Sequence, residues 1–330
     1  MSTLLVVLVV GVIFVNGFTD APASITGVVV TRTLSYRAAV LMAAVCNLLG
    51  IGAMAFVNAS VMNTVIQLAG LSGVSPAYAT AALQATMLSI ILFAMGAWYF
   101  AIPTSESHAL IAALAASSFA AAGRMYWSGW DLVVIGLLMS LVFGLFFGLV
   151  LARALTRLLD RFSKRALGGA KIAGAAASSF MHGAQDGQKF IAILVLAEMT
   201  SSGRQIGNGI LVSDHLPALF ICAIAMSLGT AIGARRIIDN IGVKMVSMDK
   251  SQGICADIGS AVCLFLASLA GIPMSTTHAK TSAIVGAGIG SGKDVNTGVV
   301  GSMVIAWIIT FPVCAALGYF LTQLIIGVLM

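Results

Sequence analysis

The sequence is poor in charged residues. Lys and Arg together number 17 and Asp and Glu 11 among 330 residues, whereas 60% are hydrophobic and the mean hydropathy is +1.06. A water-soluble surface of this size needs far more charge. Because a helical span needs about 20 apolar residues, the composition predicts on the order of ten spans and no soluble catalytic domain. We interpret the net charge of +6 as a topology signal, with no nucleic-acid binding.

Paired cysteines and a cleavable leader are also lacking. The five cysteines stand singly in apolar stretches with no CxxC spacing, which gives neither a disulfide framework nor a metal site. The first 18 residues have no basic n-region and no small-x-small cleavage site, so we interpret them as the start of the first span. The mature protein is therefore expected to begin near Met1.

Apolar segments separated by short polar or Gly-rich joints predict an all-α polytopic membrane protein with about 10–12 transmembrane or re-entrant helices. Ten segments are expected, near 3–30, 38–58, 78–100, 102–122, 131–152, 172–197, 215–234, 252–271, 272–290 and 297–327. Whether 102–122 and 272–290 cross fully or turn back as hairpins stays open at this point.

The densest basic run predicts the orientation in the membrane. It contains Arg153, Arg157, Arg161, Lys164, Arg165 and Lys171. We expect the protein in the plasma membrane. By the positive-inside rule, the linker 153–171 should then face the cytoplasm. Counting crossings from there puts both termini outside. The linker separates a first half, 1–152, from a second half, 172–330.

Two pairs of motifs indicate an internal duplication. Residues 17–25 and 183–191 share Gly-x-x-Asp-x-x-x-x-Ile, and residues 102–109 and 272–279 share Ile-Pro-x-Ser-x-x-His-Ala. Both pairs occur in the same order and at nearly the same offset. With an odd number of crossings per half, the two copies become inverted-topology repeats with broken helices, an architecture of secondary transporters.

Asp20 and Asp186 lie inside apolar segments, where a charged side chain costs at least about 2.5–3.5 kcal/mol. Residues 3–30 would form a helix of about 42 Å, longer than a ~30 Å hydrocarbon core requires. Gly17 and Pro22 flank Asp20, and Gly183 and Gly187 flank Asp186, which predicts a break with exposed carbonyls at both sites. Such sites suit Na+ or H+, although a buried polar group tied to a neighbouring helix is the alternative. The predicted cation-coupling residues are Asp20, Asp186, Glu106, Asn16 and Thr19.

The Pro-x-Ser-x-x-His segments concentrate hydroxyl groups where a helix should begin, with proline in its first turn. Free N–H groups and hydroxyls at such a helix start can bind an anion without a fixed positive charge. N-capping or interhelical hydrogen bonding is the alternative role. The predicted substrate-binding hydroxyls are Thr104, Ser105, Ser107, Ser275, Thr276 and Thr277.

Other polar residues in these segments have predicted roles as well. Gln185, Gln188 and Lys189 can contact the substrate, with a simple Asp186–Lys189 pair as the alternative. His108 and His278 are either proton relays or structural hydrogen-bonding groups. We expect Lys280 to snorkel towards the membrane surface and Asp257 to cap a helix.

At these residues the sequence resembles the inorganic phosphate transporter (PiT) family, over essentially the whole chain. The second half is closer to the family pattern, with residues 182–189 and 273–278. In the first half Thr19 and Ala23 stand where many members carry Asn, and Glu106 where many carry a hydroxyl residue. The resemblance implies phosphate uptake driven by sodium or protons, with both aspartate motifs and both hydroxyl segments meeting at one site in the middle of the membrane.

The predicted function is therefore symport of inorganic phosphate with a monovalent cation across a lipid bilayer, with no cofactor beyond the co-transported Na+ or H+. Moving an anion into a negative interior costs about 2.3 kcal/mol per charge and 100 mV, which favours coupling over uniport. The alternatives are a sulfate, thiosulfate or metal–phosphate carrier, an intramembrane hydrolase or phosphotransferase, and an anion channel. A homo-oligomer is left open.

Overall fold

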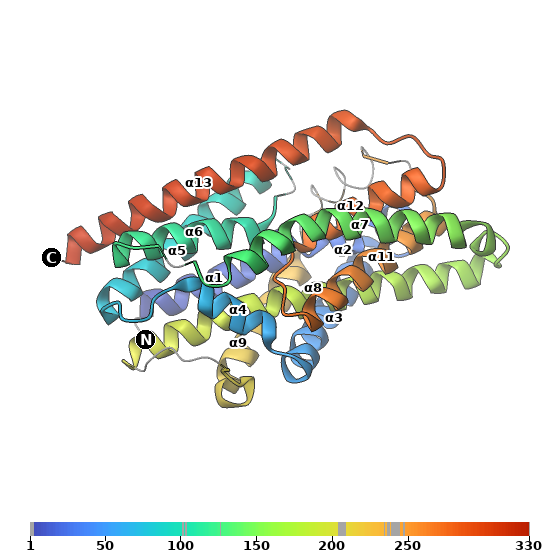
Figure 1. Cartoon of the computed structure of the whole chain (residues 1–330). Helices are drawn as coiled ribbons and strands as arrows, with labels where there is room; N and C mark the ends of the chain where they lie inside the picture. Colours follow the sequence, from blue (N-terminus) through green and yellow to red (C-terminus); the bar gives the residue numbers. More distant parts are fainter. Residues whose placement is uncertain are drawn as a thin grey trace.

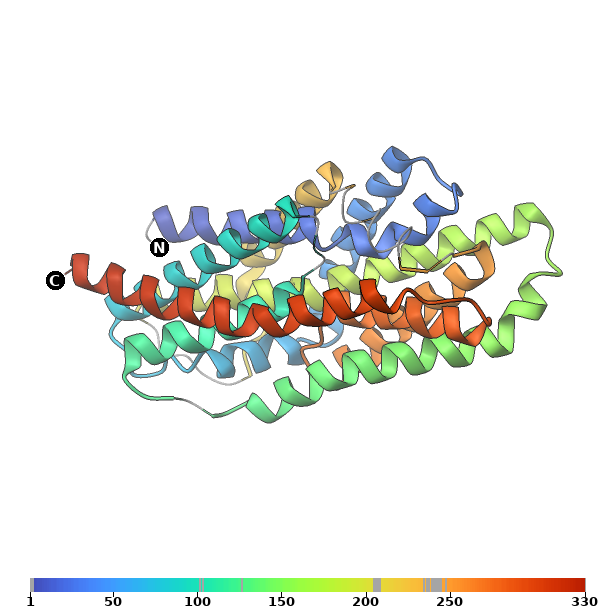
Figure 2. The ribbon, with the colours of Figure 1, turned by 90° about the horizontal axis from the view of Figure 1, so that it is seen from above.

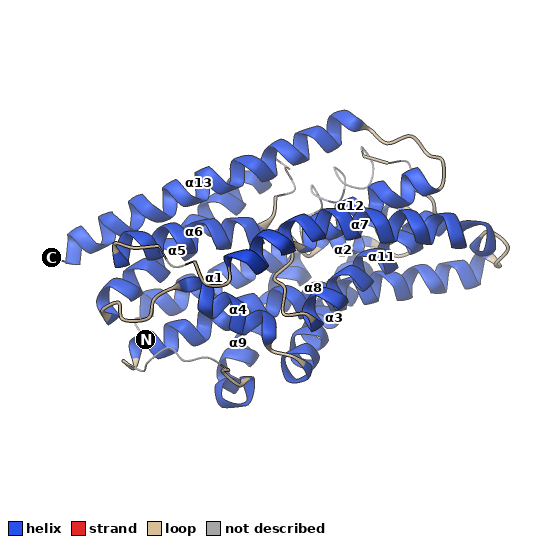
Figure 3. Ribbon diagram, in the orientation of Figure 1, coloured by secondary structure: helices blue, strands red, loops and turns tan. Residues whose placement is uncertain are grey.

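The computed structural model is built from helices. It describes residues 3–100, 102, 104–125, 127–203, 209–233, 235, 238, 245–246 and 248–329, and within them the only β-type pairing is an isolated bridge between Val246 and Val295 (Figure 3). The helices are α1 (Thr3–Thr19), α2 (Pro22–Val30), α3 (Tyr36–Val57), α4 (Ser60–Ala69), α5 (Pro76–Tyr99), α6 (Glu106–Ala122), α7 (Trp130–Leu159), α8 (Lys164–Ser201), the 3₁₀ turn η1 (Val212–His215), α9 (Leu216–Ile232), α11 (Lys250–Leu269), α12 (Thr276–Gly290) and α13 (Thr297–Leu329). The all-helical prediction is confirmed.

Seven segments are long and apolar enough to cross a membrane. They are Thr3–Val30, Tyr36–Val57, Pro76–Tyr99, Trp130–Leu159, Val212–Ile232, Lys250–Leu269 and Thr297–Val328. The last of these and α7 bury little of their surface, and their exposed Val, Ile, Leu and Phe side chains suit contact with lipid. By contrast α8, 38 residues long, has a polar centre that the other helices enclose (Figure 1).

The first span breaks where the sequence predicts it. Helix α1 ends at Thr19 and α2 begins at Pro22, so that Asp20 and Ala21 lie between them. Pro22 has no N–H to continue the helical hydrogen-bond ladder, and the donors after it reach back only three residues, from Ala23 to Asp20 and from Ser24 to Ala21. The Asp20 carboxylate therefore sits at a helix junction.

The second predicted break is wrong, because α8 runs without interruption through Asp186. This helix contains no proline, and two of its glycines, Gly183 and Gly187, serve close packing against α3. A Cβ on Gly183 would lie 2.4 Å from the Asn47 carbonyl oxygen, and one on Gly187 would lie 2.5 Å from the Ile51 side chain. Asp186 thus contributes its side chain alone, without unwound carbonyls beside it.

Two connecting segments are more helical than the sequence suggests. The short amphipathic helix α4 lies in the gap that we left between the second and third apolar segments. The basic residues of 153–171 lie on the end of α7 and on the start of α8, except for Arg161, which lies in the connection of only four residues, Asp160 to Ser163. Lys171, which we expected among the cytoplasmic basic residues, is instead completely buried in α8.

Helices α6 and α12 begin beside each other in the middle of the molecule and run towards opposite ends (Figure 1). Their 17 and 15 residues give lengths of about 26 and 23 Å, less than a ~30 Å hydrocarbon core. The described residues directly before each helix are not helical, so each helix is long enough to cross only part of the membrane. We call α6 and α12 the half-crossings. Pro273 precedes the N-cap Ser275 and is not in the first turn, contrary to the prediction; Pro103 lies outside the described residues.

The two ends of the bundle differ. Both chain termini lie at one end, and the turn between α7 and α8 lies at the other (Figure 2). At the latter end several connections are tied together: Ser251 donates to Asp160 at 2.6 Å, and the Asn296 N–H donates to the Met245 carbonyl at 2.9 Å. Two further basic residues, Arg236 and Lys244, lie outside the described residues.

Close packing of α3 on α8 predicts opposite effects for two glycines of α3. A Cβ on Gly50 would lie 2.0 Å from the Phe180 carbonyl oxygen, whereas one on Gly52 meets nothing within 4 Å. Gly50→Ala should lower the thermal unfolding temperature in detergent, because such overpacking costs about 1–3 kcal/mol or more. Gly52→Ala should leave it unchanged or raise it; equal unfolding temperatures would contradict this packing.

Candidate functional site

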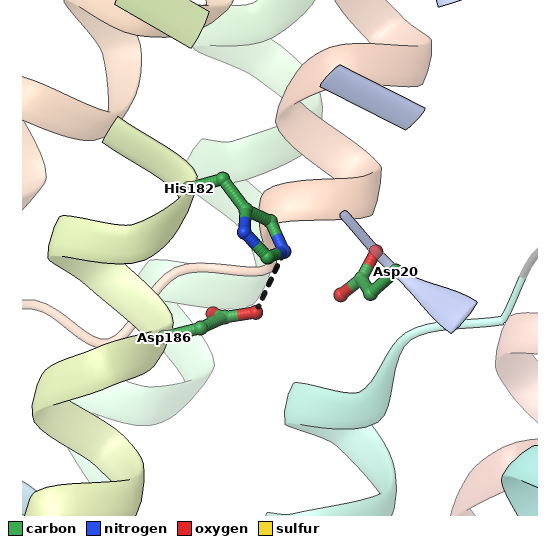
Figure 4. Close-up of side chains that lie close together, drawn as sticks. All are labelled: Asp20, His182 and Asp186. Atoms are coloured by element: carbon green, nitrogen blue, oxygen red, sulfur yellow. Dashed lines mark ion pairs between the residues drawn. The ribbon is translucent and has the colours of Figure 1, made fainter. Parts of the chain in front are cut away.

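Three carboxylates from separate parts of the chain meet in the interior. Asp20 comes from the α1–α2 junction, Glu106 from the first residue of α6 and Asp186 from the middle of α8, and they are 5%, 2% and 1% exposed. The ligand atoms of Asp20, Asp186 and His182 all lie within 4.8 Å of one another, and the three side chains point towards a common space (Figure 4). We call this group, with Glu106, the acidic site.

Threonine hydroxyls join the acidic groups to one another. Thr276, the first residue of α12, is within 3.1 Å of both Asp20 and Asp186. Its neighbour Thr277 donates to the other oxygen of Asp20, and Thr19 donates to Glu106. The start of α12 therefore bridges a carboxylate of the first half and one of the second.

Lys189 is the one lysine in contact with this group among the described residues. Its ammonium lies 2.7 Å from Asp186, 2.7 Å from the Ser107 hydroxyl and 2.5 Å from the Met274 carbonyl oxygen. It therefore joins α8 to the starts of both half-crossings. The simple Asp186–Lys189 pair that we considered exists, but it is part of this larger network.

Asn16 and His182 occupy equivalent places in the two repeated motifs and both face Asp186. The Asn16 amide donates to Asp186 at 3.2 Å, and the His182 Nε2 lies 3.5 Å from the same oxygen. His182 is held by Asn47 at 3.1 Å. We did not single out His182 or Asn47 from the sequence; the match of His182 with Asn16 in the duplicated motif was the available signal.

Both half-crossings present a capped helix start at the same point. Ser105 and Ser275 are the N-caps, each accepting the N–H of the histidine three residues later, at 3.3 and 3.2 Å. Their hydroxyls contact each other at 2.8 Å. Because each cap pairs with the third N–H alone, the first two N–H groups of α6 and α12 have no intrahelical partner. Two positive helix ends thus converge beside the acidic site.

The charges of the acidic site do not balance. Three carboxylates face one ammonium, which leaves a formal −2 when His182 is neutral. Two buried oxygens, Asn16 Oδ1 and Glu106 Oε2, also lack a hydrogen-bond donor among the described residues. Uncompensated charge is costly in the membrane interior. The oxygen atoms fit a hard monovalent cation or protons.

Other predicted residues lie elsewhere. Thr104 lines an apolar space between α5 and α13. Gln185 donates to Ser268 at 3.2 Å and to the Ile272 carbonyl at 3.3 Å, so it holds the approach to α12. Gln188 accepts the Met62 N–H at 3.3 Å and so fixes α4. Both glutamines contact the scaffold of the site.

The two histidines of the half-crossings pack together, away from the acidic contacts described above. The rings of His108 and His278 meet edge to face at 4.2 Å, and His278 also packs on Trp307 at 4.0 Å. Both histidines line an apolar cavity of about 440 Å³ between α7 and α13. The structure therefore shows ring packing for both histidines and, among the described residues, a hydrogen-bond contact of the rings only between His278 and Ser140, at 3.5 Å.

Two further expectations are wrong. Lys280 does not snorkel, and Asp257 does not cap a helix; both are buried and form an ion pair with each other. Asp257 also pairs with the buried Lys171 at 2.5 Å. A lysine and an aspartate in apolar segments are too costly to bury separately. Their presence in such segments was therefore a sequence signal that they pair with each other.

A multi-pass helical bundle with a charged site enclosed at a helix break and at two half-helix starts defines the class of membrane transporters. Comparisons with known proteins agree. The family profile described as "Phosphate transporter family" matches residues 16–167 and again 160–318, once in each half. The chain belongs to the phosphate transporter family, and it is a transporter and not an enzyme.

Individual relatives cover nearly the whole chain. A "Probable low-affinity inorganic phosphate transporter" of Bacillus subtilis (strain 168) is 32% identical over 98% of both chains. One of Rhizobium meliloti (strain 1021) is 33% identical over 94% of this chain and 93% of its own. A solved structure titled "The sodium-dependent phosphate transporter" has the same fold, with a TM-score of 0.83, 20% identity and 98% coverage of both chains.

The charge imbalance predicts that sodium stabilises the folded protein. Replacing choline by sodium at constant ionic strength should raise the unfolding temperature, with a stabilisation of about 2.7 kcal/mol at roughly a hundred times the dissociation constant. Glu106→Gln should reduce this shift. Glu198→Gln, whose side chain is 42% exposed, is the matched control and should keep it. An equal shift in both variants would remove Glu106 from the cation site.

Proposed function

We propose that the protein is a symporter that takes up inorganic phosphate together with a monovalent cation. The observation that carries this proposal is the position of Thr276. It is the first residue of α12, a helix start suited to an anion, and its hydroxyl contacts both Asp20 and Asp186. Anion-binding and cation-binding groups therefore share atoms. A cation that binds the carboxylates therefore releases the Thr276 hydroxyl to donate a hydrogen bond to an anion.

The cation binds first in this mechanism. With a formal −2 at the acidic site, an approaching phosphate is repelled until cations or protons neutralise the carboxylates. Asp20, Asp186 and Glu106 supply the ligand oxygens, and the side-chain oxygens of Asn16 and Thr19 complete the set. Each cation that binds reduces the hold of the carboxylates on the threonine hydroxyls.

Phosphate then binds at the converging helix starts. Once released from the carboxylates, the Thr276 and Thr277 hydroxyls can donate to phosphate oxygens, together with the free N–H groups of α6 and α12. Ser107 and Lys189 lie at the same point. Lys189 adds the positive charge that a helix start alone lacks. Neither ligand is bound well without the other, which is the requirement for coupling.

Alternating access follows from the duplicated halves. The family profile matches each half once, and α6 and α12 run in opposite directions from a shared starting point (Figure 1). Both observations support inverted repeats 1–152 and 172–330. Movement of one half against the other would open the site first to one side and then to the other.

The orientation is inferred from charge. The described basic residues at the end with the α7–α8 turn are Arg32, Arg37, Arg153, Arg157, Arg161, Lys164, Arg165, Arg235, Lys250 and Lys293. The end with the termini has Arg124 among the described residues. By the positive-inside rule the basic end is cytoplasmic, and both termini lie on the outer side of the plasma membrane.

Sodium is the favoured coupling ion. The site offers two carboxylate oxygens, of Asp20 and Asp186, and a His182 nitrogen within 4.8 Å of one another, which could hold a metal cation, and the structural neighbour is titled a sodium-dependent phosphate transporter. A proton would need only one carboxylate and would leave the Asn16 Oδ1, which has no hydrogen-bond donor among the described residues, without a partner. Sulfate, thiosulfate and metal–phosphate complexes are the competing substrates to test.

Uptake into proteoliposomes tests the function directly. Radiolabelled phosphate should accumulate under an inward sodium gradient, more than under a proton gradient alone. Asp186→Asn removes the carboxylate that contacts Thr276 and Lys189, and should lower uptake by about tenfold or more, the scale of one lost charge-assisted interaction. Asp214→Asn, at an exposed position of η1, is the control and should transport normally.

The design also separates the alternatives. Unchanged uptake in Asp186→Asn would remove this residue from coupling, and efficient uptake without any cation gradient would refute symport. Unlabelled sulfate or thiosulfate that competes as well as phosphate would change the assigned substrate. Currents at channel rates would indicate an anion channel.

The formal −2 further predicts how uptake depends on sodium concentration. Neutralising two charges requires more than one cation, so the initial rate should rise sigmoidally with sodium. Glu106→Gln removes one negative charge and should make the curve closer to hyperbolic. A hyperbolic curve for the unmodified protein would show that one sodium ion suffices and that the second charge is neutralised in another way.

A further inference from the structure

A second group of buried charges lies outside the acidic site. Lys171 of α8, Asp257 of α11 and Lys280 of α12 are 0%, 1% and 3% exposed, and we call them the inner cluster. Lys171 lies 2.5 Å from one oxygen of Asp257, and Lys280 contacts the other. A side chain on Gly253 would collide with the Lys171 ammonium, so the surrounding helices leave room for this lysine.

The inner cluster carries an excess of positive charge. Two lysines share one aspartate, and in the described part of the chain no other carboxylate lies within ion-pair distance of either lysine. A buried charge without a counter-ion costs several kcal/mol. Its sign is opposite to that of the acidic site, and it favours an anion.

Polar groups connect the acidic site to the inner cluster along three helices. One turn beyond Thr276 on α12 is Lys280, one turn beyond Asp20 is Ser24 on α2, and one turn before His182 on α8 is Ser178. Lys280 donates to the Ser178 hydroxyl at 3.1 Å and to the Ser24 carbonyl at 3.4 Å. Buried polar groups therefore form a continuous tract between the two sites.

On α1 and α8 the tract does not extend to the other side of the acidic site. Beyond Lys189 on α8 the buried residues are apolar from Phe190 to Ala197, and before Asn16 on α1 they are again apolar. Towards the inner cluster the polar groups instead continue to Ser251 and Gln252, which are buried at the start of α11, and Ser251 donates to Asp160 beside the α7–α8 turn at 2.6 Å. Buried ionisable groups in a membrane interior mark substrate pathways.

We propose that the inner cluster is a second, transient binding site for an oxyanion on its way from the acidic site to the cytoplasm. This inference rests on the proposed phosphate symport. The ammonium groups of Lys171 and Lys280 leave the Asp257 carboxylate and bind the oxyanion instead. The Ser178 hydroxyl supplies a further hydrogen-bond donor. Asp257 then competes for the lysines and lets the anion leave, since two unopposed lysines would retain it.

Removal of the competing carboxylate tests this proposal in the purified full-length protein. In saturating sodium, Asp257→Asn should bind radiolabelled inorganic phosphate about tenfold more tightly, the scale of one charge-assisted hydrogen bond, and should transport it more slowly. Adding Lys280→Gln to Asp257→Asn restores the net charge of the cluster. This double variant should lose the gain in affinity and still transport at least about tenfold more slowly than the unmodified protein.

The control is Lys164→Gln, which removes a lysine from the exposed start of the same helix and should leave binding and transport unchanged. A purely structural ion pair predicts weaker or unchanged binding in Asp257→Asn, which would overturn the proposal. Should Asp257→Asn not fold, unimpaired transport by the double variant would also overturn it. Absence of sodium-dependent uptake in the unmodified protein would instead refute the proposed symport.

Discussion

The contact of Thr276 with both Asp20 and Asp186 is the interaction on which the rest of the structure depends. It joins the broken first span, the uninterrupted α8 and the start of α12 at one buried point. Every group there is polar in an environment that penalises unpaired polarity, so each partner fixes the others in place. A ligand that competes for one of these groups must therefore disturb the remaining ones, which gives a physical basis for coupling.

The two halves provide related positions in different ways. Asp20 stands at a helix junction created by Pro22, whereas Asp186 stands on an unbroken helix whose glycines allow α3 to approach. The half-crossings are more alike, since both begin at a serine cap and meet through those serines. The serine-capped helix starts of the two halves are thus alike, whereas the carboxylate-bearing parts differ. Glu106, at the first helical position where the other half has Thr276, adds a third carboxylate to one side only.

Opposite charges are distributed along the axis of the molecule. The acidic site has more carboxylates than cations, and the inner cluster has more cations than carboxylates, with hydroxyl groups between them. A membrane protein that only needed stability would pair such groups completely or replace them with apolar ones. In the transport path that we propose, these separated imbalances would give successive places of preference for a cation and for an anion, whereas the buried residues of α8 from Phe190 to Ala197 are apolar.

The sequence by itself determined the class of fold, the break at Asp20, the duplicated motifs and most of the polar residues of the acidic site, because charge and proline in apolar segments have few physical explanations. It also indicated the family. Only the tertiary structure decided that α8 stays continuous, that Gln185 and Gln188 brace the scaffold, that His182 joins the site, and that Lys171, Asp257 and Lys280 pair in the interior. Those outcomes depend on which helices are neighbours: a glycine can end a helix or admit another one, and a lysine can reach the surface or an aspartate far away in the sequence. Local sequence does not contain that information.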